Sequence, residues 1–166
     1  MKKKVLSALV VLTLIIVIPI GFTNQDPFFS IKFTLLNKES SVNSKNQFCA
    51  RVIFANVNHP TIEIVPEIRY GYNGTDPFTV QAFDLNNNEI DISTNADYDW
   101  IIPDNFVQFQ EGNIISDTIC STEIYHFPVK GTYKLRLMFK PENLYVMNGE
   151  IKGQIIYSNW DTLTIR

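Results

Sequence analysis

The feature of this sequence that most constrains its fold is a series of short segments in which apolar and polar residues alternate. In the clearest one, residues 132–140, every odd position from Tyr133 to Phe139 is apolar or aromatic, and most even positions are polar or charged. The same alternation recurs in residues 31–35, 48–54, 61–64 and 78–82. Because successive side chains of a β-strand point to opposite faces of the sheet, each segment can bury one face and expose the other. The pattern predicts half-buried antiparallel strands.

Turn-forming residues separate these segments. Asparagine, glycine and proline gather at residues 58–60, 73–77, 86–88, 110–113, 128–131 and 148–149. Asparagine and glycine tolerate positive φ, and proline presets the φ angle that many turns need. No segment after residue 25 has a convincing helical period. We therefore expect an all-β fold, an antiparallel β-sandwich of about 7–9 strands.

The N-terminus has the layout of an export segment. Three lysines at positions 2–4 precede an apolar run from Val5 to Ile20. This order is typical of a signal peptide, and the run is also close to the length of a membrane-spanning helix. We expect residues 1–25 to be a signal peptide or an N-terminal membrane anchor. Residues 26–166 would then form one domain in the periplasm, the cell envelope or the extracellular space, with membrane contact only through an uncleaved first segment.

Length and charge narrow the class of protein further. With 166 residues and 45% hydrophobic residues, the chain suits one domain with a real core. It carries 14 lysines and arginines against 17 acidic residues, a net charge of −3. This balance lacks the basic surplus typical of nucleic-acid binders, so we expect no nucleic-acid partner.

The two cysteines, Cys49 and Cys120, leave two interpretations open. Outside the cytoplasm they can form a structural disulfide, which would close a loop of roughly 72 residues and be worth about 4.4 kcal/mol in the chain-entropy model. The alternation around Cys49 places its side chain opposite the apolar face, so two buried or half-buried thiols are the alternative. A catalytic thiol would need a base, and only His59, in a turn, and His126, between two aromatic residues, are available.

No motif for catalysis or for a bound metal or cofactor emerges. Neither histidine has another histidine or a cysteine at zinc-ligand spacing. Residues 84–95 resemble a calcium loop only superficially, because Glu89 and Asn95 replace the glycine and glutamate that such a loop needs, so a hairpin turn is the better interpretation. The carboxylates have no separation fixed by sequence; they include Asp97, Asp99, Asp104, Asp117 and Glu123. We expect no enzymatic activity, no cofactor and no metal.

Aromatic side chains are the remaining candidates for a binding site. Tyr70 and Tyr72 lie beside a turn, Trp100 follows an acidic segment, and Trp160 lies near the C-terminus. Exposed rings of this kind stack on sugars or anchor protein partners. The alternative is that most of them pack in the core or at a sheet edge.

Two segments carry a resemblance to known proteins. Residues 127–137, FPVKGTYKLRL, resemble the entry into a late strand of many bacterial immunoglobulin-like domains, although Lys130 stands where those domains have proline. Residues 157–165 look like the final strand of small exported proteins of Bacteroidota-type bacteria, most of which have no assigned function. The resemblance implies an immunoglobulin-like β-sandwich in which Tyr133 is a corner tyrosine whose hydroxyl bonds the backbone.

Three functions are compatible with these patterns. The leading hypothesis is a non-catalytic binding or structural module of the bacterial cell envelope that engages a protein partner. The second is a carbohydrate-binding module that uses the exposed tyrosines and tryptophans. The third is a protease inhibitor of the sandwich type, which would present a protruding loop near residues 69–77.

Overall fold

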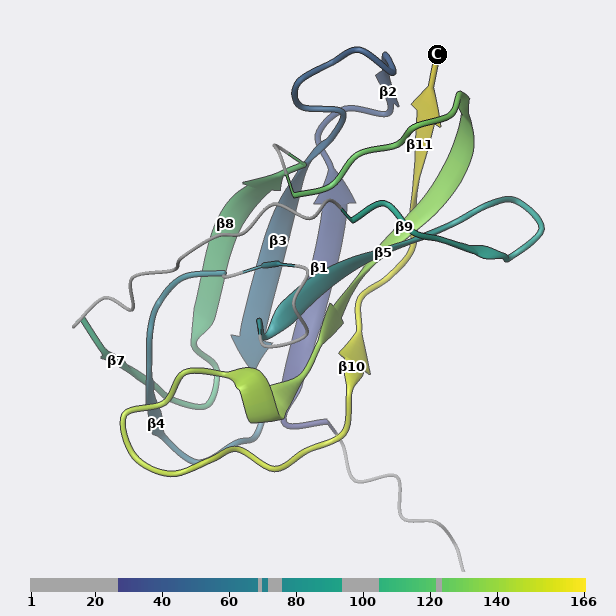
Figure 1. Ribbon diagram of the computed structural model, residues 1–166. Helices are drawn as coiled ribbons and strands as arrows, with labels where there is room; N and C mark the ends of the chain where they lie inside the picture. The colour runs from purple at the N-terminus through teal and green to yellow at the C-terminus, as the bar shows by residue number, and fades with distance from the viewer. Residues whose placement is uncertain (1–26, 69, 72–75, 94–104, 122–123) are drawn as a thin grey trace, which may run out of the picture.

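The strands of the protein pack as the two facing layers of an antiparallel β-sandwich (Figure 1). The computed structural model describes residues 27–68, 70–71, 76–93, 105–121 and 124–166. The all-β prediction is confirmed. The predicted export segment lies outside the described residues, and within them no helix is long and apolar enough to cross a bilayer.

The first layer is a three-stranded sheet. Strand β1 (Phe29–Leu35) pairs with β3 (Cys49–Asn56), and β3 pairs on its other side with β8 (Ile114–Cys120), both antiparallel. On β3 the alternation predicted from sequence is realised, because Ala50, Val52 and Phe54 are buried while the residues between them are partly or fully exposed.

The second layer is a larger sheet centred on β9 (Gly131–Phe139). One side of β9 pairs with β5 (Phe78–Phe83), which continues to the short β6 (Glu89–Ile90). The other side pairs with β10 (Ile156–Tyr157) and β11 (Asp161–Ile165) in turn. The short β2 (Glu39–Ser40) adds to β11, in parallel.

A short two-stranded ribbon and one helical turn complete the fold of the described residues. Strands β4 (Ile62–Ile64) and β7 (Val107–Phe109) form a two-stranded ribbon, and a single 3₁₀ turn covers Pro141–Asn143. The described residues thus contain eleven strands, more than the expected 7–9. Three of them have only two residues each. A segment of that length is too short to show an alternation, so sequence patterning did not find these strands.

Phenylalanine rings join the two layers. Phe54 of β3, Phe78 of β5 and Phe139 of β9 are all buried, and the centroids of the Phe54 and Phe78 rings each lie 4.8 Å from that of Phe139. Since the inward faces of both sheets are filled in this way, the outward faces carry the side chains that are free to meet other molecules.

The expected final strand over residues 157–165 is interrupted, which corrects that prediction. Tyr157 faces Met138 and Asp161 faces Leu135, so four steps of the chain span only three on β9. One extra residue on one strand of an antiparallel pair is a β-bulge. The bulge separates β10 from β11.

Candidate functional site

The two cysteines form a disulfide, which confirms that interpretation over the two-thiol alternative. Cys49 and Cys120 face each other across β3 and β8, and their Cα atoms are 4.0 Å apart. Both are half-buried, on the side of the three-stranded sheet away from the core. The bond therefore joins neighbouring strands of one sheet, whereas antibody domains bridge their two sheets.

Tyr133 packs at the start of β9. Its side chain is 6% exposed, and its hydroxyl donates a hydrogen bond of 2.8 Å to the carbonyl of Val129. The ring lies 4.7 Å from that of Phe127, between centroids. Burial raises the pKa of the Tyr133 hydroxyl above its ordinary value. These contacts give Tyr133 a structural role at the turn into β9.

Of the four aromatic residues singled out from sequence, Tyr70 and Trp160 lie within the described residues. Tyr72 and Trp100 lie outside the described residues. Tyr70 has a structural contact, because its hydroxyl donates to the Cys120 carbonyl over 3.0 Å and accepts from the Cys120 N–H over 3.3 Å. Trp160 is 46% exposed and lies on the outer face of the larger sheet.

Trp160 belongs to a cluster that sequence analysis missed. The guanidinium carbon of Arg136 lies 3.9 Å from the centroid of the Tyr157 ring, 4.5 Å from that of Trp160 and 5.5 Å from that of Phe83. Phe83 and Trp160 meet edge to face at 5.2 Å. Phe83, Arg136, Tyr157 and Trp160 are called the arginine–aromatic cluster below. Each cation–π contact is worth about 0.5–1 kcal/mol at an exposed site.

Neighbouring strands bring the cluster together. Arg136 points outward from β9 and faces Gln81 of β5, whose side-chain oxygen accepts a 2.8 Å hydrogen bond from the arginine Nε. Phe83 points outward two residues further along β5, and Tyr157 lies on the other side of β9. The signal in the sequence was present but incomplete, because the pattern shows that Arg136 is outward without showing which residues flank it.

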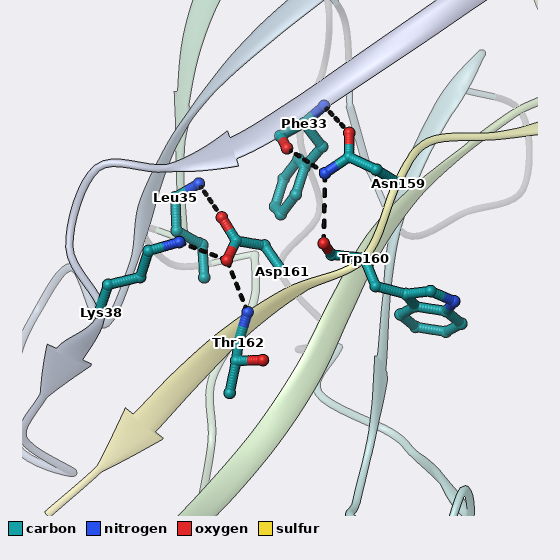
Figure 2. A network of polar contacts seen from close by, with 7 residues as sticks. All are labelled: Phe33, Leu35, Lys38, Asn159, Trp160, Asp161 and Thr162. Carbon is teal, nitrogen blue, oxygen red and sulfur yellow. Dashed lines mark hydrogen bonds and ion pairs between the residues drawn. The ribbon is translucent and has the colours of Figure 1, made fainter.

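The bulge brings Trp160 into the cluster. Ser158 is buried and its hydroxyl accepts from the Leu137 N–H, while the Asn159 side chain bonds the backbone of β1 in the other sheet. The next side chain, Trp160, then lies over Arg136 on the outer face. Figure 2 shows the indole directed to the opposite side of this segment from the Asn159 and Asp161 side chains. Bulges re-aim side chains in this way.

Hydrogen bonds hold the bulge against the free edge of β1. The Asn159 side chain accepts from the Phe33 N–H over 3.0 Å and donates to the Phe33 carbonyl over 2.8 Å (Figure 2). Asp161 accepts from the Leu35 N–H over 2.8 Å and forms an ion pair with Lys38. These side chains satisfy the edge groups of β1 as a paired strand would. Trp160 is therefore held between two anchored neighbours.

The same contacts change the pKa of the Asp161 carboxyl. Burial alone would raise its pKa, but the Lys38 ammonium and the backbone N–H groups of Leu35 and Thr162 outweigh this effect. The pKa of Asp161 therefore lies below its ordinary value of 3.8. The carboxylate stays ionised, and the anchor intact, at neutral pH.

A hollow lies beside the arginine–aromatic cluster. It has a volume of about 530 Å³, and its lining includes Gln81, Glu89, Asp91, Met138 and Lys140. Gln81 also contacts Arg136, so the hollow and the cluster share a border. Hydrogen bonds from Ser93 lower the pKa of Asp91 below its ordinary value. The hollow offers polar and apolar contacts next to the rings.

The other candidate groups are not assembled into a reactive site in the described structure. His59 stacks on Phe29 at 5.2 Å between ring centroids, and the backbone N–H of His126 bonds the Ile92 carbonyl. Asp84 accepts hydrogen bonds from the backbone of the β5–β6 turn, which confirms the hairpin there. Within the described part, no three metal-ligating side chains gather.

Several candidate site residues from the sequence are not among the residues that the structure describes. Among the carboxylates considered, Asp97, Asp99, Asp104 and Glu123 lie outside the described residues, as does most of the loop 69–77 expected for a protease inhibitor. Comparison of the chain with protein-family models and with curated proteins finds no match. The resemblance to exported immunoglobulin-like proteins therefore stays a prediction.

Proposed function

We propose that this protein is a non-catalytic binding module of the bacterial cell envelope that engages a protein partner through the arginine–aromatic cluster. The observation that carries the proposal is the exposure of Tyr157 and Trp160, at 44% and 46%, on a sheet face where both are held beside Arg136. The disulfide between Cys49 and Cys120 and the sequence layout of residues 1–25 support the envelope location.

The composition of the cluster favours a protein partner. Tryptophan, tyrosine and arginine are the residues most enriched among those that dominate protein–protein binding energy. They supply a large contact area for little conformational entropy, and here the entropy is reduced further because the rings and the guanidinium pack on one another. A preformed patch of this kind needs little reorganisation on binding.

The test is a comparison of single variants against a partner recovered with the wild-type full chain. Trp160→Ala and Tyr157→Ala should each weaken binding of that purified partner about tenfold or more. Phe28→Ala is the matched control, because Phe28 is an exposed ring, 38% accessible, outside the cluster. Unchanged unfolding midpoints would show that the variants fold. Cluster variants that bind as tightly as the control would contradict the proposal.

A glycan ligand is the second candidate, because one exposed indole on a sheet face also suits stacking on a pyranose ring. Arg136 already occupies the space over the Tyr157 and Trp160 rings, which leaves less ring surface for a sugar. A glycan array separates the two candidates. Binding of a neutral glycan that disappears in Trp160→Ala, without loss of folding, would favour the glycan.

A further inference from the structure

We infer that the segment docking on the arginine–aromatic cluster is an extended acidic peptide of the partner protein, lying along β9 with its carboxylates over Lys134, Arg136 and Lys140. The inference rests on the proposed function and names the chemistry of the partner. Its basis is the distribution of positive charge on the outer face of the larger sheet.

Three cations lie along the outward side of β9, two within the strand and one just past its end. Lys134 and Arg136 are successive outward residues of β9, followed by Met138 and then Lys140 just past its end, and all four side chains are half-buried. Residues two apart on a strand lie on the same face, about 6.8 Å from each other. In a chain with a net charge of −3, this face is a local cationic stripe.

The cations of the stripe are not neutralised by the described part of the chain. Ion pairs between described residues join Lys38 to Asp161 and Arg166 to Glu39. Lys134 instead bonds the neutral side-chain oxygen of Asn87, over 2.8 Å. The described carboxylates that border the face already accept hydrogen bonds, Glu89 from Gln81, Asp91 from Ser93, and Asp84 from the backbone of the β5–β6 turn. The stripe is thus available to anionic groups of another molecule.

Arg136 is preorganised to bind a carboxylate. Its Nε is used by Gln81, and the Tyr157 and Trp160 rings hold the guanidinium plane. No hydrogen bond from its two terminal nitrogens to another described residue is found. A guanidinium presents these nitrogens as a fork that matches the two oxygens of a carboxylate. A carboxylate bound there would be bordered by the exposed indole and phenol.

An extended peptide fits the spacing of the stripe. Its own same-face residues repeat at about 6.8 Å, so acidic residues at alternate positions can meet Lys134 and Arg136 together. Met138 sits between Arg136 and Lys140 on that face, which favours an apolar residue at the matching position. The preferred partner pattern is therefore acidic, acidic, apolar, acidic at every second residue.

The experiment measures binding of a fluorescein-labelled peptide to the full chain by fluorescence anisotropy. The peptide is long enough to cover β9 and carries glutamate, glutamate, leucine and glutamate at alternate positions, with threonine between them. Arg136→Gln should weaken binding about tenfold, and Lys134→Gln or Lys140→Gln each roughly threefold, since these removals delete one charge contact each. Lys32→Gln is the matched control, because exposed Lys32 lies on the other sheet. Binding should also weaken as salt is raised.

Two further probes separate the sources of negative charge. A peptide with the same glutamates grouped in one block should bind more weakly than the alternating one, and so should an oligogalacturonate with as many carboxylates. Equal losses for Arg136→Gln and Lys32→Gln would overturn the inference, as would stronger binding of the oligogalacturonate or absence of peptide binding. The proposed function is tested by a different measurement, the binding of the partner protein to Trp160→Ala. None of the peptide results changes the outcome of that measurement, so failure of the proposed function is seen separately.

Discussion

Replacement of Asn159 by alanine tests the physical basis of the bulge that presents Trp160. The side chain of Asn159 makes two hydrogen bonds to the backbone of Phe33, of 3.0 Å and 2.8 Å, in a partly buried position. Each such bond contributes about 0.5–1.5 kcal/mol net, and an edge group left without a partner adds to the loss. We expect Asn159→Ala to lower the free energy of unfolding by about 2–3 kcal/mol.

Two assays measure this change. Urea unfolding gives the free energy, and the melting temperature should fall by roughly 6–12 °C for a domain of this size. Amide hydrogen exchange adds a local reading, because the Phe33 N–H should lose protection while the N–H groups between β3 and β8 keep theirs. The magnitude and the location of the loss are both predicted.

The control is Asn148→Ala, which removes an exposed asparagine from a turn. Surface changes of this kind usually stay within about 0.5 kcal/mol. If Asn159→Ala destabilises the protein no more than Asn148→Ala, and the Phe33 amide stays protected, then the side chain does not substitute for a paired strand and the reasoning is wrong.

Two further predictions concern stability. Because the pKa of Asp161 is lowered in the folded state, its ionised carboxylate stabilises the fold above its ordinary pKa of 3.8, and this contribution is lost as the pH falls below 3.8. The difference in free energy of unfolding between wild type and Asp161→Asn should therefore be full at neutral pH and shrink in acid; an equal difference on both sides of pH 3.8 would contradict the role of the Lys38 pair. Replacement of Cys49 and Cys120 together by alanine removes a cross-link between residues 71 positions apart. It should lower the free energy of unfolding by up to about 4.4 kcal/mol, measured by urea unfolding, and treatment of wild type with a thiol reductant should reproduce the loss; stability that is the same with and without the cross-link would contradict this.

The alternation in the sequence predicted the strands whose inward faces are filled by apolar residues. On β9, Tyr133, Leu135 and Leu137 are buried as their positions indicate, because a central strand must bury every second residue. Strand β8 was not predicted, because few of its side chains are buried. Only Ile119 of that strand is fully buried, so the strand does not need apolar and polar residues in alternation.

The candidate site could not be predicted from the sequence, because it depends on register between strands. Arg136 is visible as an outward residue, but Phe83 lies more than fifty positions earlier in the chain and meets it only through the pairing of β5 with β9. Trp160 was singled out from the sequence. Its place in the cluster depends on a one-residue bulge, which the alternation of apolar and polar residues does not predict. Tyr70 was also singled out as a binding residue, but its hydroxyl forms a hydrogen bond with the backbone carbonyl of Cys120.

Site-specific photo-crosslinking in the producing cells can show directly whether the outer face of the larger sheet is the binding surface. A photoreactive residue would replace exposed Thr162, on that face, or exposed Thr34, on the outer face of the three-stranded sheet. We expect a crosslinked protein partner from position 162 that is absent with position 34. Crosslinking from position 34 alone, or equally from both, would contradict it.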